Sequence, residues 1–300
     1  MTELKPTQCA ICLNDAYDRE IYPANFQPQD LSPEVFSARR LPDKIHYRMV
    51  VCRKCGLMRC NPVLSQESLD HLYTQSHFTY PQEALWAAQT YRAYFMRYLG
   101  NVSKEACILE IGCGNGAFLN ELYQQGYYNL CGIEPSVEAI NESGLMKEFI
   151  HQGMFSEGFH PKEHFDLITA FHVFDHISEP NKFLQACKVN LKPGGKLLLI
   201  MHDIGSLLAS ILSRNCPMID IEHPFLYNKV TLKNFLTVRG FYIQKIFSVQ
   251  NRYPLKYWIK IMPGHLSLQK RILEFLQEHP IGQVSLRLNA GNMGFIAAKK

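Results

Sequence analysis

The sequence has no long apolar run. Its longest apolar stretches, such as LLLIM at residues 197–201, are far shorter than the roughly 20 residues that a membrane-spanning helix needs. Residues 1–20 also lack an apolar segment behind a basic start, so no secretory signal peptide is predicted. These absences predict a soluble, cytoplasmic protein without a membrane span.

Charge of one sign is scarce as well. The chain has 31 Lys and Arg residues against 27 Asp and Glu residues, and the two signs are interspersed, which leaves a net charge of +4. Proteins that bind nucleic acid or an anionic membrane surface usually concentrate basic residues. A nucleic-acid partner is therefore not expected.

Cysteine, by contrast, is plentiful. Because the cytosol keeps thiols reduced, the ten cysteines indicate metal binding rather than disulfides where their spacing is regular. Cys9 and Cys12 form one Cys-x-x-Cys pair, Cys52 and Cys55 form another, and two such pairs complete a tetrahedral Zn²⁺ site. Four thiolates leave no open position for water, so we predict a structural site in a zinc-binding module over residues 1–62. The alternative is that these are four unrelated buried thiols.

Strands and helices alternate from residue 107 onward. We expect strands at 107–111, 130–134, 148–151, 165–170, 196–201, 241–248 and 294–299, with helices at 116–126, 136–143, 180–190 and 231–239. Such alternation predicts an α/β fold with a Rossmann-like, doubly wound sheet that is mostly parallel, with an antiparallel last strand. Residues 63–100 are predicted to form a helical lid or linker. Residues 101–300 are predicted to form the main domain, with an insertion at about 249–290.

A glycine-rich turn follows the first of these strands, in ILEIGCGNG at residues 108–116. Gly112, Gly114 and Gly116 let the backbone approach a ligand without a Cβ in the way, and the following helix offers free N–H groups. Gly112 and Gly114, with Ala117, also fit the dinucleotide-binding fingerprint. The turn alone therefore indicates a nucleotide-like ligand without identifying it.

Two acidic residues help to identify this nucleotide-like ligand. Glu110, at the end of the strand, would repel a pyrophosphate but suits an α-ammonium group such as that of S-adenosylmethionine. Glu134 ends the next strand, roughly 20 residues later, where a carboxylate binds ribose hydroxyls. NAD and S-adenosylmethionine both need the ribose contact, so Glu110 is the residue that favours S-adenosylmethionine.

Four motifs in order resemble the class I S-adenosylmethionine-dependent methyltransferase family: EIGCGNG at 110–116, GIEPS at 132–136, FDLITAFHVFDHI at 165–177 and LKPGGKLLLI at 191–200. The resemblance covers about residues 100–248. It implies a methionine site at Glu110, Gly112, Cys113 and Gly114, a ribose site at Glu134 and Pro135, an adenine site at Met154 and Phe155, and a far cofactor wall at Phe171 and His172. Many family members carry Asp after the third strand to bind the adenine amino group; Gly153 and its neighbours stand there here, so backbone groups are expected to contact adenine.

The N-terminal segment carries a second resemblance. YRMVVCRKCGLMRCNP at 47–62, followed by a helix with tyrosines, is similar to the zinc module of methyltransferases that act on nucleotide-linked sugars and related polysaccharide or natural-product substrates. In that family the module and the tyrosine-rich segment cover the substrate. The resemblance implies a small-molecule or glycan acceptor, contacted by Tyr73, His77 and Tyr80, whose alternative role is ordinary packing.

A general base is expected in the loops at the carboxyl ends of the strands, because a hydroxyl or carbon nucleophile must lose a proton. His223, in IEHPFLYN at 221–228, is the first candidate. The loop resembles the Tyr-His-Glu-His motif of sugar C-methyltransferases, whose final His acts as base, although its Tyr and first His are replaced here. His176 is the second candidate; its spacing from His172 could also suggest a metal, but a lining role is favoured.

Two other functions fit part of the pattern. One is an RNA methyltransferase that uses the zinc module to bind RNA, but residues 1–60 carry too mild a basic bias for a surface that tracks phosphates. The other is a cofactor-binding scaffold without catalysis. The intact glycine turn and Glu134 disfavour the scaffold, although they indicate binding rather than turnover.

Overall fold

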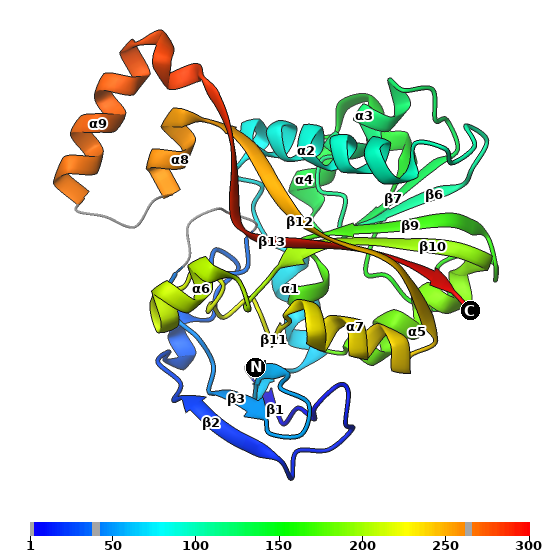
Figure 1. Cartoon of the computed structure of the whole chain (residues 1–300), viewed down its shortest axis with the longest axis horizontal. Coiled ribbons are helices and arrows are strands. Elements are labelled where there is room, and N and C mark those ends of the chain that lie inside the picture. Colours follow the sequence, from blue (N-terminus) through cyan, green and yellow to red (C-terminus); the bar gives the residue numbers. More distant parts are fainter. Residues whose placement is uncertain (1–2, 38–42, 262–265) are drawn as a thin grey trace.

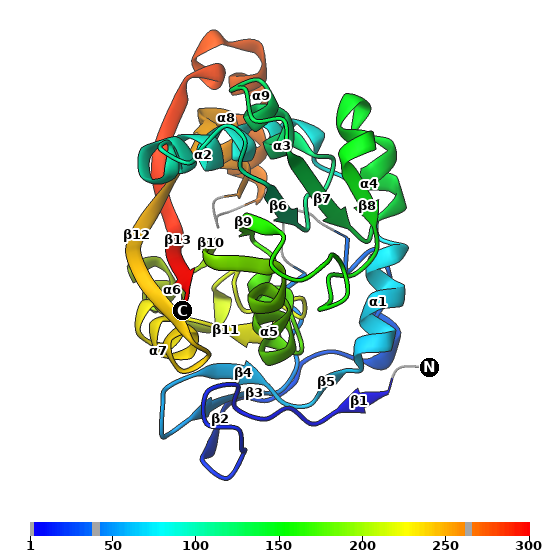
Figure 2. The ribbon, with the colours of Figure 1, turned by 90° about the vertical axis from the view of Figure 1, so that its right-hand side faces the viewer.

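The central sheet has seven strands in the order β12-β13-β10-β9-β6-β7-β8, seen from two sides in Figure 1 and Figure 2. The computed structural model describes residues 3–37, 43–261 and 266–300. The strands of this sheet are β6 (Ile108–Ile111), β7 (Leu130–Glu134), β8 (Ile150–Gln152), β9 (Phe165–Phe171), β10 (Leu191–His202), β12 (Phe241–Pro254) and β13 (Ser285–Lys299).

Strand directions follow the predicted pattern. β6 pairs in parallel with β7 and β9, β7 pairs in parallel with β8, and β9 pairs in parallel with β10. β13 is antiparallel to both β10 and β12. This arrangement confirms the predicted Rossmann-like, mostly parallel sheet with an antiparallel last strand, and it brings the carboxyl ends of β6, β7, β9 and β10 to one edge.

Helices cover both faces of the sheet. The first seven α-helices are α1 (Gln66–Thr74), α2 (Pro81–Leu99), α3 (Ala117–Tyr123), α4 (Val137–Asn141), α5 (Pro180–Asn190), α6 (Leu207–Leu212) and α7 (Lys229–Val238). The 3-10 helices among them are η1 (Pro28–Asp30), η2 (Gly144–Phe149), η3 (Phe174–His176) and η4 (Ser213–Asn215). Successive strand residues point to opposite faces. Ile108 thus belongs to a buried cluster with side chains of α2 and α3, whereas Leu109 belongs to a second cluster with side chains of α5 and α7.

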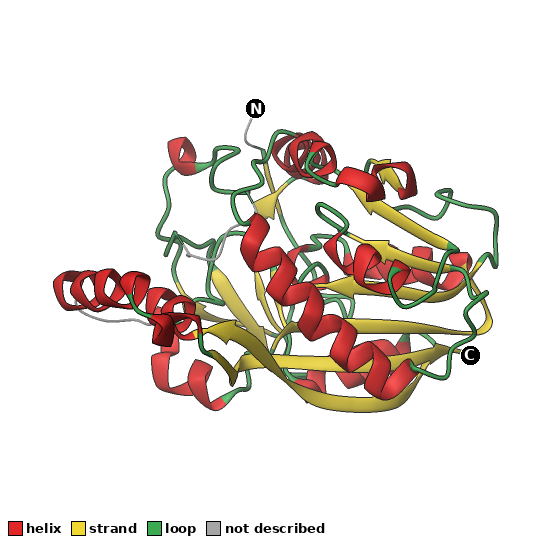
Figure 3. Cartoon of the chain, turned by 90° about the horizontal axis from the view of Figure 1, so that it is seen from above, coloured by secondary structure: helices red, strands yellow, loops and turns green. Residues whose placement is uncertain are grey.

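The last two strands extend past the others as a two-stranded ribbon. This ribbon carries α8 (Leu255–Ile261), α9 (Leu266–Glu278) and the turn η5 (Pro280–Gln283) away from the sheet, as Figure 1 and Figure 3 show. Residues 249–290, where an insertion is expected, begin inside β12 and end inside β13.

The N-terminal segment forms small antiparallel sheets of its own. β1 (Leu4–Lys5) pairs with β5 (Val63–Leu64), and β2 (Asp18–Tyr22), β3 (Met49–Cys52) and β4 (Met58–Cys60) lie in order in a second sheet. The fourth strand of that sheet, β11 (Phe225–Leu226), comes from the main domain and pairs with β4. A strand that directly follows His223 is therefore hydrogen-bonded to the N-terminal sheet. Among the described helices, none combines the length and apolar character needed to cross a bilayer.

Candidate active site

The glycine turn between β6 and α3 has the backbone shape that the sequence predicts. Gly112, Gly114 and Gly116 have φ angles of +65°, +54° and +71°, in the left-handed region that favours glycine. A Cβ on Gly112 would lie 2.4 Å from Cγ2 of Val173. At Gly114 the nearest such contact is 3.8 Å away, on the Phe78 ring, so this part of the turn leaves room for a ligand.

A cavity of about 700 Å³ opens beside this turn, at the carboxyl edge of the parallel strands. Its size falls within the range of small-molecule sites. Every residue predicted for the cofactor, the acceptor and the base lies on its wall: Glu110, Gly112, Cys113, Gly114, Glu134, Pro135, Met154, Phe155, Phe171, His172, Tyr73, His77, Tyr80, His176 and His223. Residues far apart in the sequence thus meet at one site.

Two buried carboxyl groups lie beside each other in the cofactor half of the cavity. Glu134 accepts hydrogen bonds from the N–H groups of Gly114 (2.8 Å) and Ser136 (2.9 Å). Glu110 is 4% exposed, and its Oε2 has no hydrogen-bond partner within the described part of the chain. Burial, and then repulsion from Glu134, raises the pKa of Glu110 well above its ordinary value. An unpartnered carboxyl oxygen at this depth fits a cationic ligand group.

His172, His176, His202 and His223 also lie on the cavity wall, and Asp175 is buried next to His202. The ring of His223 lies 4.6 Å from that of His176 and 4.9 Å from that of His202, between ring centroids. Nδ1 of His202 lies 2.6 Å from Oδ2 of Asp175, which is 1% exposed. Burial opposes ionisation of Asp175, but the neighbouring histidines, His202 foremost, hold its pKa well below the ordinary value.

The buried histidines are held neutral. Burial, and then repulsion from His223, lowers the pKa of His176 to about 3. Burial, and then repulsion from His202, lowers the pKa of His223. The pair of Asp175 and His202 was not predicted, because Asp175 lies in η3, after β9, whereas His202 ends β10. The signal available was that His202 ends β10, at the edge where the site forms.

Of the residues predicted for the acceptor, Tyr73 lies in the last turn of α1, and His77 and Tyr80 lie on the segment between α1 and α2. Tyr73 Oη lies 3.3 Å from Nδ1 of His176, and burial raises the pKa of Tyr73 well above its ordinary value. His77 is exposed and lies 2.8 Å from Oε2 of Glu138 on α4. The ring of Tyr80 packs on that of Phe78, with centroids 4.9 Å apart. The segment between the two helices is therefore attached to α4 and forms part of the cavity wall.

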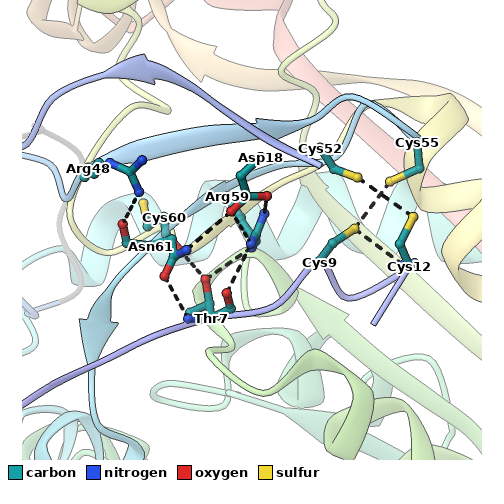
Figure 4. Close-up of polar contacts among 10 residues, drawn as sticks. All are labelled: Thr7, Cys9, Cys12, Asp18, Arg48, Cys52, Cys55, Arg59, Cys60 and Asn61. Carbon is teal, nitrogen blue, oxygen red and sulfur yellow. Dashed lines mark hydrogen bonds and ion pairs between the residues drawn. The ribbon is translucent and has the colours of Figure 1, made fainter. Parts of the chain in front are cut away.

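The four predicted metal ligands come together outside this cavity, as Figure 4 shows. Sγ of Cys9 lies 3.4 Å from Sγ of Cys55, and Sγ of Cys52 lies 3.8 Å from Sγ of Cys12. Zn–S bonds of about 2.3 Å in a tetrahedron place sulfurs about 3.8 Å apart. The quartet therefore fits a tetrahedral metal ion.

A buried ion pair lies next to the quartet and was not predicted. Arg59 is fully buried, and two of its nitrogens each lie 2.7 Å from an oxygen of Asp18 (Figure 4). The same guanidinium donates to the carbonyl and the hydroxyl of Thr7. This network connects Thr7, which follows β1, and Asp18 of β2 to Arg59 of β4. Nothing in the sequence around Arg59 indicates that its side chain is buried, so the ion pair could not be predicted.

Comparison with known proteins identifies the family. Residues 84–246, more than half of the chain, match the family model described as "Methyltransferase domain". The chain belongs to this methyltransferase family. The matched part of the methyltransferase contains the glycine turn, both buried glutamates and His223.

Individual relatives of the methyltransferase are remote. It is 22% identical over 109 residues to the ubiquinone biosynthesis O-methyltransferase of Yersinia pestis (strain Pestoides F), which covers 34% of this chain and 44% of that protein. The match thus spans less than half the length of that curated relative. The PH0226 protein of Pyrococcus horikoshii OT3 superposes with a TM-score of 0.50 at 16% identity, covering 73% of this chain and 92% of that one, and shows the same fold. A SAM dependent methyltransferase from Archaeoglobus fulgidus reaches a TM-score of 0.49 at 20% identity, covering 71% and 94%.

Proposed function

We propose that the protein transfers a methyl group from S-adenosylmethionine to a small-molecule or glycan acceptor. The observation that carries this proposal is the buried Glu110, whose unpartnered Oε2 lies on the wall of a cavity beside a glycine turn. A carboxyl group in this position suits an α-ammonium group and opposes a pyrophosphate. Membership of the methyltransferase family supports the same donor.

The cofactor residues are proposed as the sequence indicated. Glu110, Gly112, Cys113 and Gly114 hold the methionine moiety, and Glu134 and Pro135 hold the ribose. Met154 and Phe155 pack against the adenine, while Phe171 and His172 form the far wall. The bound cofactor supplies an electrophilic methyl group on a sulfonium. The protein aligns the acceptor in line with the S–CH₃ bond and excludes water.

The histidines supply the base for an acceptor that must lose a proton. His223, whose lowered pKa keeps it neutral, remains the candidate from the sequence. His202 is a second candidate, because Asp175 accepts from Nδ1 and so leaves Nε2 as the basic nitrogen. His176 is a poor base, since a pKa of about 3 is far from neutral pH. Its contact with Tyr73 favours a role in placing the acceptor.

The size of the cavity limits the acceptor. Tyr73, His77 and Tyr80 lie on its wall, and about 700 Å³ must hold the cofactor and the acceptor together. This supports a small acceptor or the terminal sugar of a glycan, including a nucleotide-linked sugar. The Cys9, Cys12, Cys52 and Cys55 quartet is proposed to bind a structural Zn²⁺.

Calorimetry with S-adenosylhomocysteine tests the donor. We expect binding by the wild-type protein, none by Glu134→Ala, and unchanged binding by Glu142→Ala, which alters an exposed glutamate nearby. Undiminished affinity of Glu134→Ala, or tighter binding of NAD, would overturn the assignment. Incubation with labelled S-adenosylmethionine and candidate acceptors then tests turnover; cofactor binding without transfer to any of them would favour the scaffold.

A further inference from the structure

One thiol and two imidazole groups form a cluster outside the cavity. Cys131, His151 and His160 each offer one ligand atom, and these three atoms lie within 4.8 Å of one another. None of the three residues lies on the wall of the cavity. The cluster is also separate from the Cys9 quartet, because it lies on β7, on β8 and on the loop that leads to β9.

The register of the sheet places two of these side chains on the same face. His151 of β8 pairs with Ile133 of β7, and Cys131 lies two residues before Ile133. Residues two apart on a strand share a face, so Cys131 and His151 point to the same side. The loop between β8 and β9 then returns over this face and brings His160 to them.

One ring nitrogen of His160 lacks a hydrogen-bond partner among the described residues. Its Nδ1 is buried and has no hydrogen-bond partner in the part of the chain that is described. An imidazole nitrogen buried in this way normally has a partner, because its desolvation is otherwise uncompensated. A histidine that only filled space beside Phe159 and Phe165 would leave this nitrogen uncompensated, whereas coordination of a metal ion through Nδ1 would compensate it.

A second thiol and a third imidazole adjoin the cluster. The ring of His164 stacks on that of His160, with centroids 4.2 Å apart. Nε2 of His164 lies 3.7 Å from Sγ of Cys107, which precedes β6. Thiolate and imidazole are the ligands that Zn²⁺ prefers, and this set contains no carboxylate that would favour a harder ion.

We propose that Cys131, His151 and His160 bind a zinc ion, with water as the fourth ligand. Binding forms one Zn–S and two Zn–N bonds, and the Sγ proton of Cys131 passes to solvent. Ligand atoms around tetrahedral zinc lie about 3.5 Å apart, so the cluster must contract slightly. His151 is exposed and can rotate to allow this. The ion would fasten the loop that carries Met154 and Phe155 to β7 and β8, and so hold one wall of the cavity in place.

Metal stoichiometry tests this site without any assay of methyl transfer. The full chain is stripped with a chelator, reloaded with ZnCl₂ and exchanged into metal-free buffer, and bound zinc is measured by mass spectrometry. We expect His151→Gln to retain one zinc fewer per chain than the wild type, and His160→Gln to do the same. The exposed His71→Gln is the matched control and should retain the wild-type amount.

This difference does not depend on the Cys9 quartet. If both sites bind, the wild type holds two ions and His151→Gln holds one; if the quartet does not bind, the numbers are one and none. Equal zinc in His151→Gln and in the wild type overturns the proposal. A second readout is proteolysis of the loop at 153–164, which zinc should slow in the wild type but not in His151→Gln. Equal protection in both proteins would also contradict it.

Discussion

Oδ2 of Asp175 lies 2.6 Å from Nδ1 of His202, and Asp175 is almost completely buried behind the histidine. Its pKa is held well below the ordinary value, so the carboxylate stays charged and keeps the proton of His202 on Nδ1. Nε2 is then available to accept a proton. His223 has no carboxylate partner of this kind: its Nδ1 has no hydrogen-bond partner within the residues described, and its ring is hydrogen-bonded to the backbone of Met218.

We therefore expect Asp175→Asn to lower kcat by about 10²- to 10⁴-fold, the usual contribution of a general base. Affinity for S-adenosylhomocysteine should change little, because the pair lies on η3 and β10, whereas Glu110 and Glu134 lie on β6 and β7. Steady-state kinetics on an accepted substrate measure the effect. If His202 acts through Asp175, the double variant Asp175→Asn/His202→Gln is no slower than His202→Gln alone. Additive losses, or full activity in His202→Gln, leave His223 as the base.

Cofactor binding should release a proton from Glu110. The pKa of this carboxyl group is raised, so the free protein keeps it neutral at a pH where an ordinary glutamate is charged. An ammonium group favours the ionised form, so affinity for S-adenosylhomocysteine should increase as the pH rises toward that pKa, by at most about tenfold per pH unit. Calorimetry in buffers of different ionisation enthalpy measures the released proton. Glu110→Gln should bind more weakly and without this pH dependence; an unchanged dependence would mean that another group releases the proton.

Removal of metal from the Cys9 quartet should loosen the N-terminal segment before the main domain. Its small sheets bury too little surface to hold together alone. We expect chelation, or Cys12→Ser, to expose residues 1–62 to protease while the central sheet keeps its circular dichroism. Cys216→Ser, a buried cysteine outside the quartet, is the control. Full protease resistance of the segment without metal would contradict the zinc assignment.

Loss of the buried ion pair should destabilise the same segment. Arg59→Ala leaves Asp18 without its cation, and breaking a buried pair in this way typically costs about 3–5 kcal/mol. Arg48→Ala removes an exposed pair with Glu20 and should cost at most about 1 kcal/mol. Denaturant unfolding of the two variants, followed by a probe in residues 1–62, gives the comparison. Similar small losses in both would show that the Arg59 pair contributes little.

The sheet and the cofactor half of the site were predictable from local patterns. Alternating strands and helices gave the parallel order, and the glycine turn marked one end of the cavity. Glu110 and Glu134 could be placed at this edge from the sequence, because Glu110 lies next to the last residue of β6 and Glu134 is the last residue of β7. Each of these features is marked by residues that lie close together in the sequence.

The group of histidines on the cavity wall depends on pairings that no local pattern contains. Asp175 and His202 meet because β9 and β10 are neighbours and the loop after β9 turns back toward the end of β10. β11 is a two-residue strand, too short to give an alternating pattern, and its partner lies far away in the N-terminal segment. Arg59 is buried only because Asp18 and Thr7 surround it, which the sequence does not reveal.

The pairing of β11 with β4 has a consequence for how the chain can be altered. Phe225 and Leu226 follow His223 after a single proline. They are hydrogen-bonded to β4, which begins six residues after Cys52. The N-terminal segment therefore helps to position the His223 loop, because β4 pairs with β11. Exchanging it for the corresponding piece of another enzyme would shift the loop itself, so a graft intended to change acceptor choice must include residues 221–228 to keep the histidine in register.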